Sequence, residues 1–141
     1  MTRATVGVAA GLAVWVAVTT AAGLIVRVSW PAYAAVADAM TFTLPMMFAR
    51  LVIGALATLA MGLAASIVVR RSRAAPLAAG IVLLLVFIPV HISLWERFPI
   101  WYHLTFLLSL VPLSVVGGRI SSLSADGRVS DHRPRHAAGR F

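Results

Sequence analysis

Four long apolar runs divide the chain, and short segments between them carry most of its charges. The runs cover residues 6–26, 44–69, 76–95 and 100–116. A transmembrane helix needs about 20 mostly apolar residues, because each residue rises about 1.5 Å and the hydrocarbon core is about 30 Å thick. The pattern therefore predicts an all-α integral membrane protein, with a four-transmembrane-helix bundle formed by residues 1–118.

The segments between the runs differ in length. Residues 70–75 and 96–99 form short turns, so the runs that they join should be antiparallel neighbours. The first connection, residues 27–43, is longer. Within it Ser29 can cap a short helix and Pro31 suits the first turn of that helix. We expect a short helix at the membrane interface here, with an irregular loop as the alternative.

The two ends of the chain need separate interpretation. The first apolar run is longer than the 7–15 residues of a signal-peptide core, so we expect it to remain as a span. Residues 119–141 contain five arginines and few apolar side chains. This segment is expected to be a disordered cytoplasmic tail that lies on anionic lipid headgroups.

The composition supports the membrane assignment. Hydrophobic residues make up 61% of the 141 residues and charged residues only 11%, whereas about a quarter of a soluble domain is charged. These values exclude an ordinary soluble domain, a disordered chain and a nucleic-acid-binding module. There is no cysteine, which removes disulfides, thiol chemistry and cysteine-ligated metals from consideration.

The basic residues predict the orientation. The net charge is +8, and all twelve basic residues are arginines. If the N-terminus is inside, the outer loops hold only Arg27 and Arg97, so both termini are expected in the cytoplasm. The bias towards Ala, Val, Gly and Arg suggests a bacterium, and hence its inner (plasma) membrane. The arginines expected inside, which would contact anionic headgroups, are Arg3, Arg70, Arg71, Arg73, Arg119, Arg128, Arg133, Arg135 and Arg140.

Small residues recur at intervals of four in the first two runs. Helices in lipid associate by close backbone contact at such residues. We expect these rows to pack within the bundle, and dimerisation through the first run is the alternative. The predicted packing residues are Gly7 and Gly11 in the first run, and Gly54, Thr58, Gly62 and Ser66 in the second.

Aromatic and polar residues gather at one end of the predicted bundle. Nine of the twelve aromatic residues fall near the outer ends of the runs, where an aromatic belt would lie. Several ionisable residues occur at the same level. The candidate ligand-binding cluster at the outer face consists of Arg50, His91, Glu96, His103, Trp95, Trp101 and Tyr102.

His91 and His103 should lie at similar depth on adjacent helices, because each is four residues from the connecting turn. Two imidazoles in this position can hydrogen-bond to each other, ligate a haem iron or a metal, or contact a quinone. We expect the hydrogen bond, because large side chains crowd the hairpin and Glu96 is the one candidate for a third ligand. No metal site and no bound cofactor are therefore expected, with haem or quinone as the alternative.

Arg50 is the one charged residue inside an apolar run. A central arginine costs about 2.5–3.5 kcal/mol on membrane-insertion scales. Arg50 is therefore expected to pair with Glu96 or Asp38, or to face a wet cavity. An ion pair would fix the helix register, whereas a cavity would be a candidate functional site.

The sequence contains no readable catalytic constellation. It has no Ser-His-Asp arrangement, no glycine-rich phosphate loop, no HExxH motif and no paired carboxylates. We therefore expect a non-enzymatic accessory or scaffold subunit that packs in the bilayer beside a membrane-protein partner or a second copy of itself. The alternatives are a ligand-, quinone- or haem-binding protein and a small oligomeric transporter or channel. Nucleic acid is not an expected partner.

Overall fold

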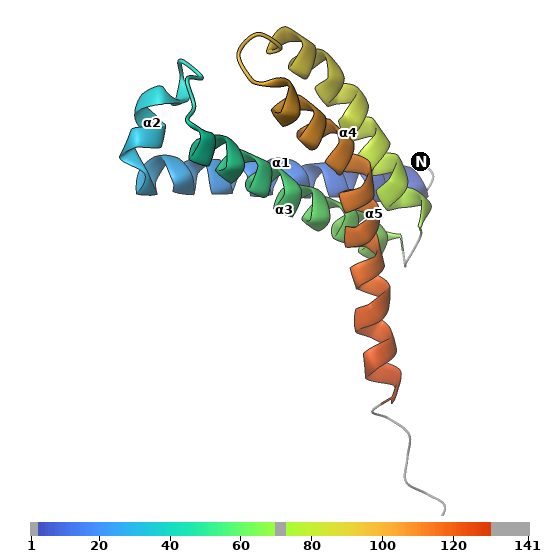
Figure 1. The fold of residues 1–141 in the computed structure, drawn as a ribbon. Coiled ribbons are helices and arrows are strands. Elements are labelled where there is room, and N and C mark those ends of the chain that lie inside the picture. The colour runs from blue at the N-terminus through green and yellow to red at the C-terminus, as the bar shows by residue number, and fades with distance from the viewer. Residues whose placement is uncertain (1–2, 70–72, 131–141) are drawn as a thin grey trace, which may run out of the picture.

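The computed structural model describes residues 3–69 and 73–130, and these residues form five helices (Figure 1). Four of the helices are long and apolar enough to cross a membrane. The sequence-based prediction of an all-α membrane protein with four spans is therefore confirmed, and the first loop does contain a short helix. The helices are α1 (Arg3–Ser29), α2 (Pro31–Ala37), α3 (Leu44–Val68), α4 (Ala74–Ser93) and α5 (Ile100–Ser130).

The break between α1 and α2 follows from a proline. Trp30 adopts φ −129° and ψ 85°, because a residue that precedes proline is driven out of the helical region. Pro31 starts α2, as predicted. The predicted capping role of Ser29 is wrong, because its hydroxyl donates to the carbonyl of Ile25 at 2.7 Å and so belongs to the last turn of α1.

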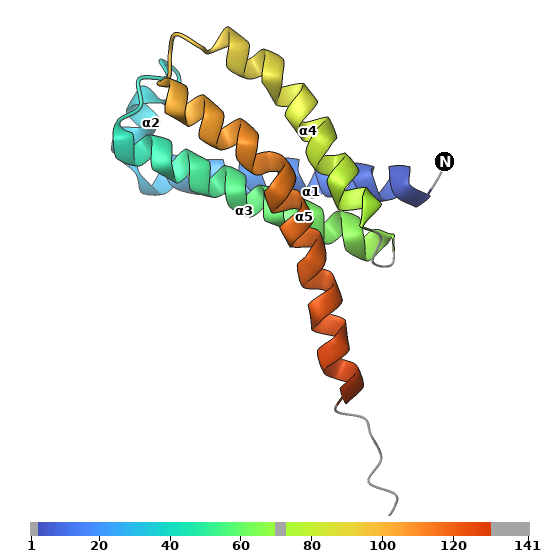
Figure 2. The same cartoon turned by 45° about the vertical axis from the view of Figure 1, so that its right-hand side comes forward.

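Two of the four spans, α3 and α4, each contact the other three spans. The short helix α2 packs against α1. Figures 1 and 2 show α3 running alongside α1, while α5 crosses α3 at a steep angle. The predicted neighbours, α3 with α4 and α4 with α5, are in contact. The α2 end of the bundle therefore brings together the end of α1, the start of α3, the end of α4 and the start of α5.

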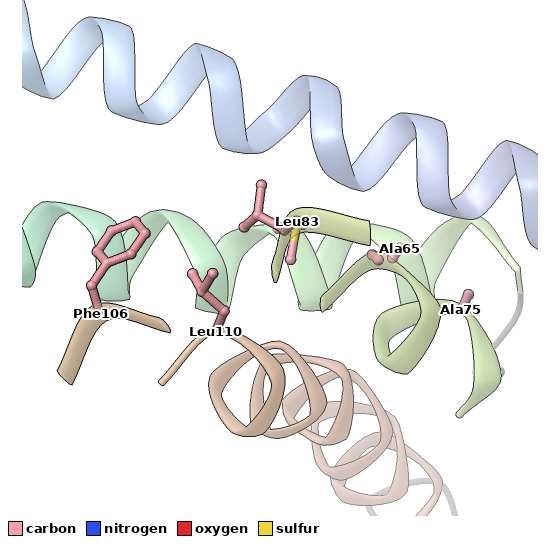
Figure 3. Packing of buried hydrophobic residues seen from close by; sticks show 7 residues of the cluster. Ala65, Ala75, Leu83, Phe106 and Leu110 are labelled. Carbon is pink, nitrogen blue, oxygen red and sulfur yellow. The ribbon is translucent and has the colours of Figure 1, made fainter. Parts of the chain in front are cut away.

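The core between the spans combines three alanines with four larger side chains (Figure 3). Ala65, Ala75 and Ala79 are completely buried, with Met61, Leu83, Phe106 and Leu110 packed beside them. Small residues let helix backbones approach closely, which is how helices associate where lipid removes the hydrophobic driving force. Many other large aliphatic side chains face outward, as lipid contact requires. Examples with more than half of their surface exposed are Leu24, Ile67, Leu85, Ile92 and Leu108.

The glycines of the predicted packing rows all lie inside the bundle. A Cβ atom on Gly7 would meet Val69, directly after α3, and one on Gly11 would meet the backbone of Met61. At Gly62 it would overlap the backbone of Ser114 in α5. These contacts place the glycines of the rows against neighbouring helices of the same chain. Gly54 belongs to the same set, since a Cβ there would come within 2.9 Å of the Phe106 ring.

The polar members of the rows are buried too. The Thr58 hydroxyl donates to the carbonyl of Gly54 at 2.7 Å. It also accepts a bond of 3.2 Å from the Trp15 indole of α1. Ser66 shares a hydrogen bond of 2.9 Å with Ser121 of α5. Thus α3 uses one face to bind α1 and α5 through both backbone contact and hydrogen bonds.

The predicted end of the fourth span at residue 116 is wrong, because α5 continues to Ser130. Gly117 and Gly118 do not end the helix. A Cβ on the first would overlap the Leu59 backbone, and one on the second would approach the Pro76 ring at 2.6 Å. Close packing thus offsets the roughly 1 kcal/mol that a glycine costs inside a helix.

Because α5 extends to Ser130, the prediction of a disordered tail from residue 119 is wrong for residues 119–130. These residues are helical, and the end of α5 extends beyond the bundle (Figure 2). Residues 131–141, together with Arg70 and Arg71, lie outside the described part of the chain.

Candidate functional site

A cavity of about 240 Å³ lies at the α2 end of the bundle. All five helices contribute to its lining, which is mostly aromatic and aliphatic and includes Trp15, Ile53, Phe87 and Phe106. Small-molecule sites typically have this character, with a few convergent polar groups on an apolar wall. The polar lining residues are Thr19, Tyr33, Arg50, His91, Tyr102 and His103.

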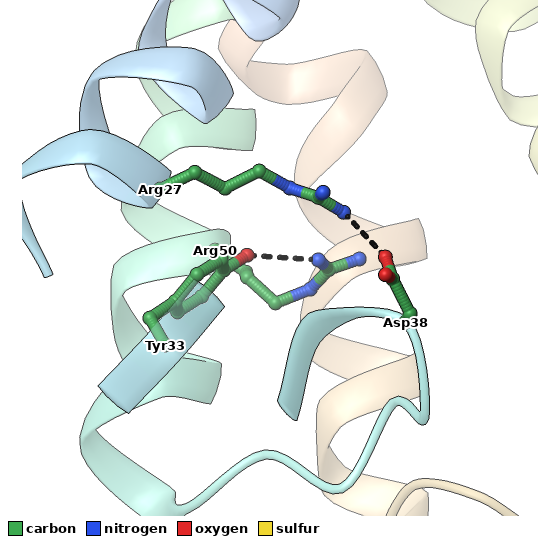
Figure 4. A network of polar contacts seen from close by, with 4 residues as sticks. All are labelled: Arg27, Tyr33, Asp38 and Arg50. Atoms are coloured by element: carbon green, nitrogen blue, oxygen red, sulfur yellow. Dashed lines mark hydrogen bonds and ion pairs between the residues drawn. The ribbon is translucent and has the colours of Figure 1, made fainter. Parts of the chain in front are cut away.

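Arg50 projects from the second turn of α3 and is bound by two phenols. Its Nη1 donates to the Tyr33 hydroxyl at 3.0 Å (Figure 4). Its Nε donates to the Tyr102 hydroxyl at 3.3 Å. The guanidinium carbon also lies 4.6 Å from the centre of the Phe42 ring. All three partners are neutral, and a cation held against an aromatic face gains further electrostatic stabilisation.

The predicted ion pair of Arg50 with Asp38 or Glu96 is wrong. Asp38 pairs instead with Arg27 at 3.2 Å, where both side chains are well exposed (Figure 4). Glu96 is exposed in the α4–α5 turn. The reason is the placement of α2, which turns the phenol of Tyr33 towards α3 and leaves Asp38 beyond the end of the helix, next to α1.

The two histidines meet as the sequence predicted. His91 of α4 and His103 of α5 lie with their Nδ1 atoms 2.8 Å apart, and both side chains are buried. One Nδ1 donates and the other accepts, so the pair shares a single proton along this bond. The second ring nitrogen of His103, Nε2, is buried and has no hydrogen-bond partner in the described structure.

Aromatic stacking holds the two imidazoles in place. The His91 ring stacks on Phe106 at a centroid distance of 4.8 Å, and the His103 ring stacks on Trp95 at 4.9 Å. Phe106 in turn packs against Phe87 of α4 at 5.1 Å. Because aromatic rings stack on both imidazoles, the nitrogen positions are set by packing as well as by the hydrogen bond.

The structure thus places only part of the predicted ligand-binding cluster at the cavity. Arg50, His91, Tyr102 and His103 line the cavity, whereas Glu96, Trp95 and Trp101 do not. Trp95 covers the outer side of His103, and Trp101 packs on Phe48 at 5.6 Å. Both tryptophans retain more than a third of their surface exposed, as residues of an aromatic belt do.

No family model, curated protein or solved structure matches this chain. The chemistry of the cavity therefore has to be judged from its own geometry. Its described lining contains a guanidinium, two phenols and two imidazoles, but no carboxylate. Such a set donates hydrogen bonds and carries positive charge, which suits binding of a molecule with acceptor groups.

The geometry does not favour haem. Axial histidines on two helices must leave room for a porphyrin between them, yet the two Nδ1 atoms are in hydrogen-bond contact. The cavity of about 240 Å³ is also below the range of about 300–1,000 Å³ for pockets that hold drug-sized ligands. A smaller molecule fits the space better.

Two lining residues outside the predicted cluster make key contacts. Tyr33 falls in the expected interfacial helix and is not among the predicted cluster, although its phenol is the closest hydrogen-bond partner of Arg50. Trp15 was not singled out, although it is the one aromatic residue of α1 and lies far from either end of the span. A tryptophan in that position was the available signal, since tryptophans in spans usually lie at the interfaces.

Proposed function

We propose that this protein is a membrane-embedded binding protein for a small molecule, with the cavity at the α2 end as its site and no catalytic step. The observation that carries the proposal is the guanidinium of Arg50 in the wall of that cavity, whose described partners are two neutral phenols and an aromatic ring. A charge that is removed from water without an opposite charge is costly. A bound ligand with acceptor groups lowers this cost.

The proposed location is the inner membrane of a bacterium, with both termini in the cytoplasm. The support is the excess of arginine in the segments at the end of the bundle opposite α2. In this orientation the cavity lies towards the outer leaflet. The ligand then enters from outside the cell or laterally from the outer half of the bilayer.

A role as a scaffold subunit has less support. It was expected mainly because of the small-residue rows, and Gly7, Gly11, Gly54 and Gly62 all contact neighbouring helices of the same chain. Those rows are therefore not available to bind a partner. Transport through an oligomer has no feature in its favour among the described residues.

The test is native mass spectrometry of the full-length protein, extracted with a mild detergent from a bacterial membrane. We expect a bound small molecule that is distinct from bilayer lipids. The variant Arg50→Gln should lose this mass, because it removes the guanidinium charge while keeping a polar side chain in the wall. Thermal unfolding of each variant checks that the bundle remains folded.

Arg27→Gln is the matched control. Arg27 pairs with Asp38 and does not line the cavity, so this variant should retain the bound mass. Wild-type protein that carries only bilayer lipid would contradict a binding role. Equal retention by wild type and a folded Arg50→Gln variant would show that the cavity is not the site.

A further inference from the structure

The charge of the cavity is not balanced by any described side chain. Arg50 contacts only Tyr33, Tyr102 and Phe42. The two described carboxylates are elsewhere, because Asp38 is bound to Arg27 and Glu96 is exposed in a turn. A charge removed from water is stable only when it is paired and hydrogen-bonded. The site therefore offers an unneutralised cation within a membrane span.

Arg50 and its two phenol partners keep several donors beyond the hydrogen bonds that they make with each other. A guanidinium has five N–H groups, and two of those of Arg50 donate to the phenols, which leaves three. Because Tyr33 and Tyr102 accept these bonds, each phenol keeps its own proton as a further donor. The planar fork of a guanidinium matches a carboxylate better than it matches a single carbonyl oxygen.

The size and walls of the cavity limit the rest of the molecule. An engineered cavity of about 150 Å³ holds a benzene molecule, and this cavity is about 240 Å³. It therefore accommodates one ring with a substituent of a few atoms. Phe87, Phe106 and Trp15 form the aromatic part of the wall, and offset or edge-on ring contacts with them favour a flat aromatic body over an alkyl chain.

We infer that the ligand is a single-ring aromatic carboxylate, whose carboxylate lies on Arg50 between the two phenols and whose ring packs against the aromatic wall. This inference rests on the proposed binding function and narrows its ligand class.

The test uses full-length protein in nanodiscs of uncharged phosphatidylcholine, so that no anionic lipid competes. Ligand-observed NMR measures the affinity for benzoate, for its neutral isostere benzamide, for octanoate and for 2-methyl-1,4-naphthoquinone. We expect benzoate to bind at least tenfold more tightly than each of the other three. Arg50→Gln should remove the preference for benzoate over benzamide, and Glu96→Gln, which neutralises an exposed carboxylate outside the cavity, should leave it unchanged.

The probes separate failure of the inference from failure of the proposed function. If benzamide or the quinone binds as tightly as benzoate, the ligand is not a carboxylate but the cavity still binds ligands. If octanoate binds most tightly, the inference that the ligand has an aromatic ring is wrong. If no probe binds and the extracted protein carries no small molecule, both proposals are wrong. Should Arg50→Gln fail to fold, the comparison of benzoate with benzamide in the wild type remains decisive.

Discussion

Gly62 lies where the backbones of α3 and α5 approach most closely among the described glycines of α3. A Cβ atom there would overlap the Ser114 backbone, which cannot move aside as a flexible side chain can. The neighbouring contact of the Ser114 hydroxyl with the Pro76 carbonyl ties α5 to α4 at the same level. The absence of a Cβ atom at Gly62 thus allows α5 to lie close to α3 at the level where α5 also contacts α4.

Gly62→Ala should destabilise the bundle by about 2 kcal/mol, since overpacking of this kind typically costs about 1–3 kcal/mol. Gly23→Ala is the matched control, because a Cβ at Gly23 meets nothing within 4 Å. That change should be neutral or slightly stabilising, as alanine favours helices more than glycine does. Thermal unfolding in one detergent compares the two variants, and equal stability would contradict the close approach of α3 and α5.

At the scale of a single element, α2 is held by contacts of unequal strength. Tyr33 is buried and accepts a bond from the charged Arg50, a type of hydrogen bond worth about 1.5–3 kcal/mol. The pair of Arg27 with Asp38 is well exposed, and exposed ion pairs contribute about 0–1 kcal/mol. The docking of this short helix should therefore depend on the phenol and hardly at all on the ion pair.

Hydrogen exchange of the α2 amides tests this difference. Tyr33→Phe should lower their protection about tenfold, because the bond to Arg50 is lost while the ring remains. Arg27→Gln should change it by less than about threefold. If Arg27→Gln had the larger effect, the exposed ion pair and not the Tyr33 contact would hold α2 in place.

At the scale of the whole molecule, the arginine distribution predicts how the bundle lies in the membrane. The chain has no cysteine, so a single introduced cysteine reports its own position without background. Glu96 is exposed in the turn between α4 and α5, and Arg73 is exposed directly before the first residue of α4. They therefore mark opposite ends of the bundle.

A membrane-impermeant maleimide should label Glu96→Cys in intact cells. Arg73→Cys should react only after the cells are permeabilised, because eight arginines remain to keep its side of the bundle in the cytoplasm. The reverse pattern would place the cavity towards the cytoplasm. It would contradict the proposed entry of the ligand from the outer side.

The sequence by itself determined the spans and the pairing of the two histidines. A long apolar run forms a helix in lipid because each residue can satisfy its backbone only within its own segment, which makes the span a local property. His91 and His103 were predictable for a related reason, since a short turn holds their two helices in fixed register. The burial of the small-residue rows follows from the same need for close contact.

Only the tertiary structure decided the partners of Arg50, the unsatisfied atom of His103 and the length of α5. Arg50 meets Tyr33 because α2 folds back against α1 and turns this phenol towards α3, and the direction of that fold depends on a turn rather than on any periodicity. The glycines that were expected to end the fourth span instead pack against α3 and α4. A cavity, like these contacts, depends on how separate helices fit together, and no single segment of the sequence contains that information.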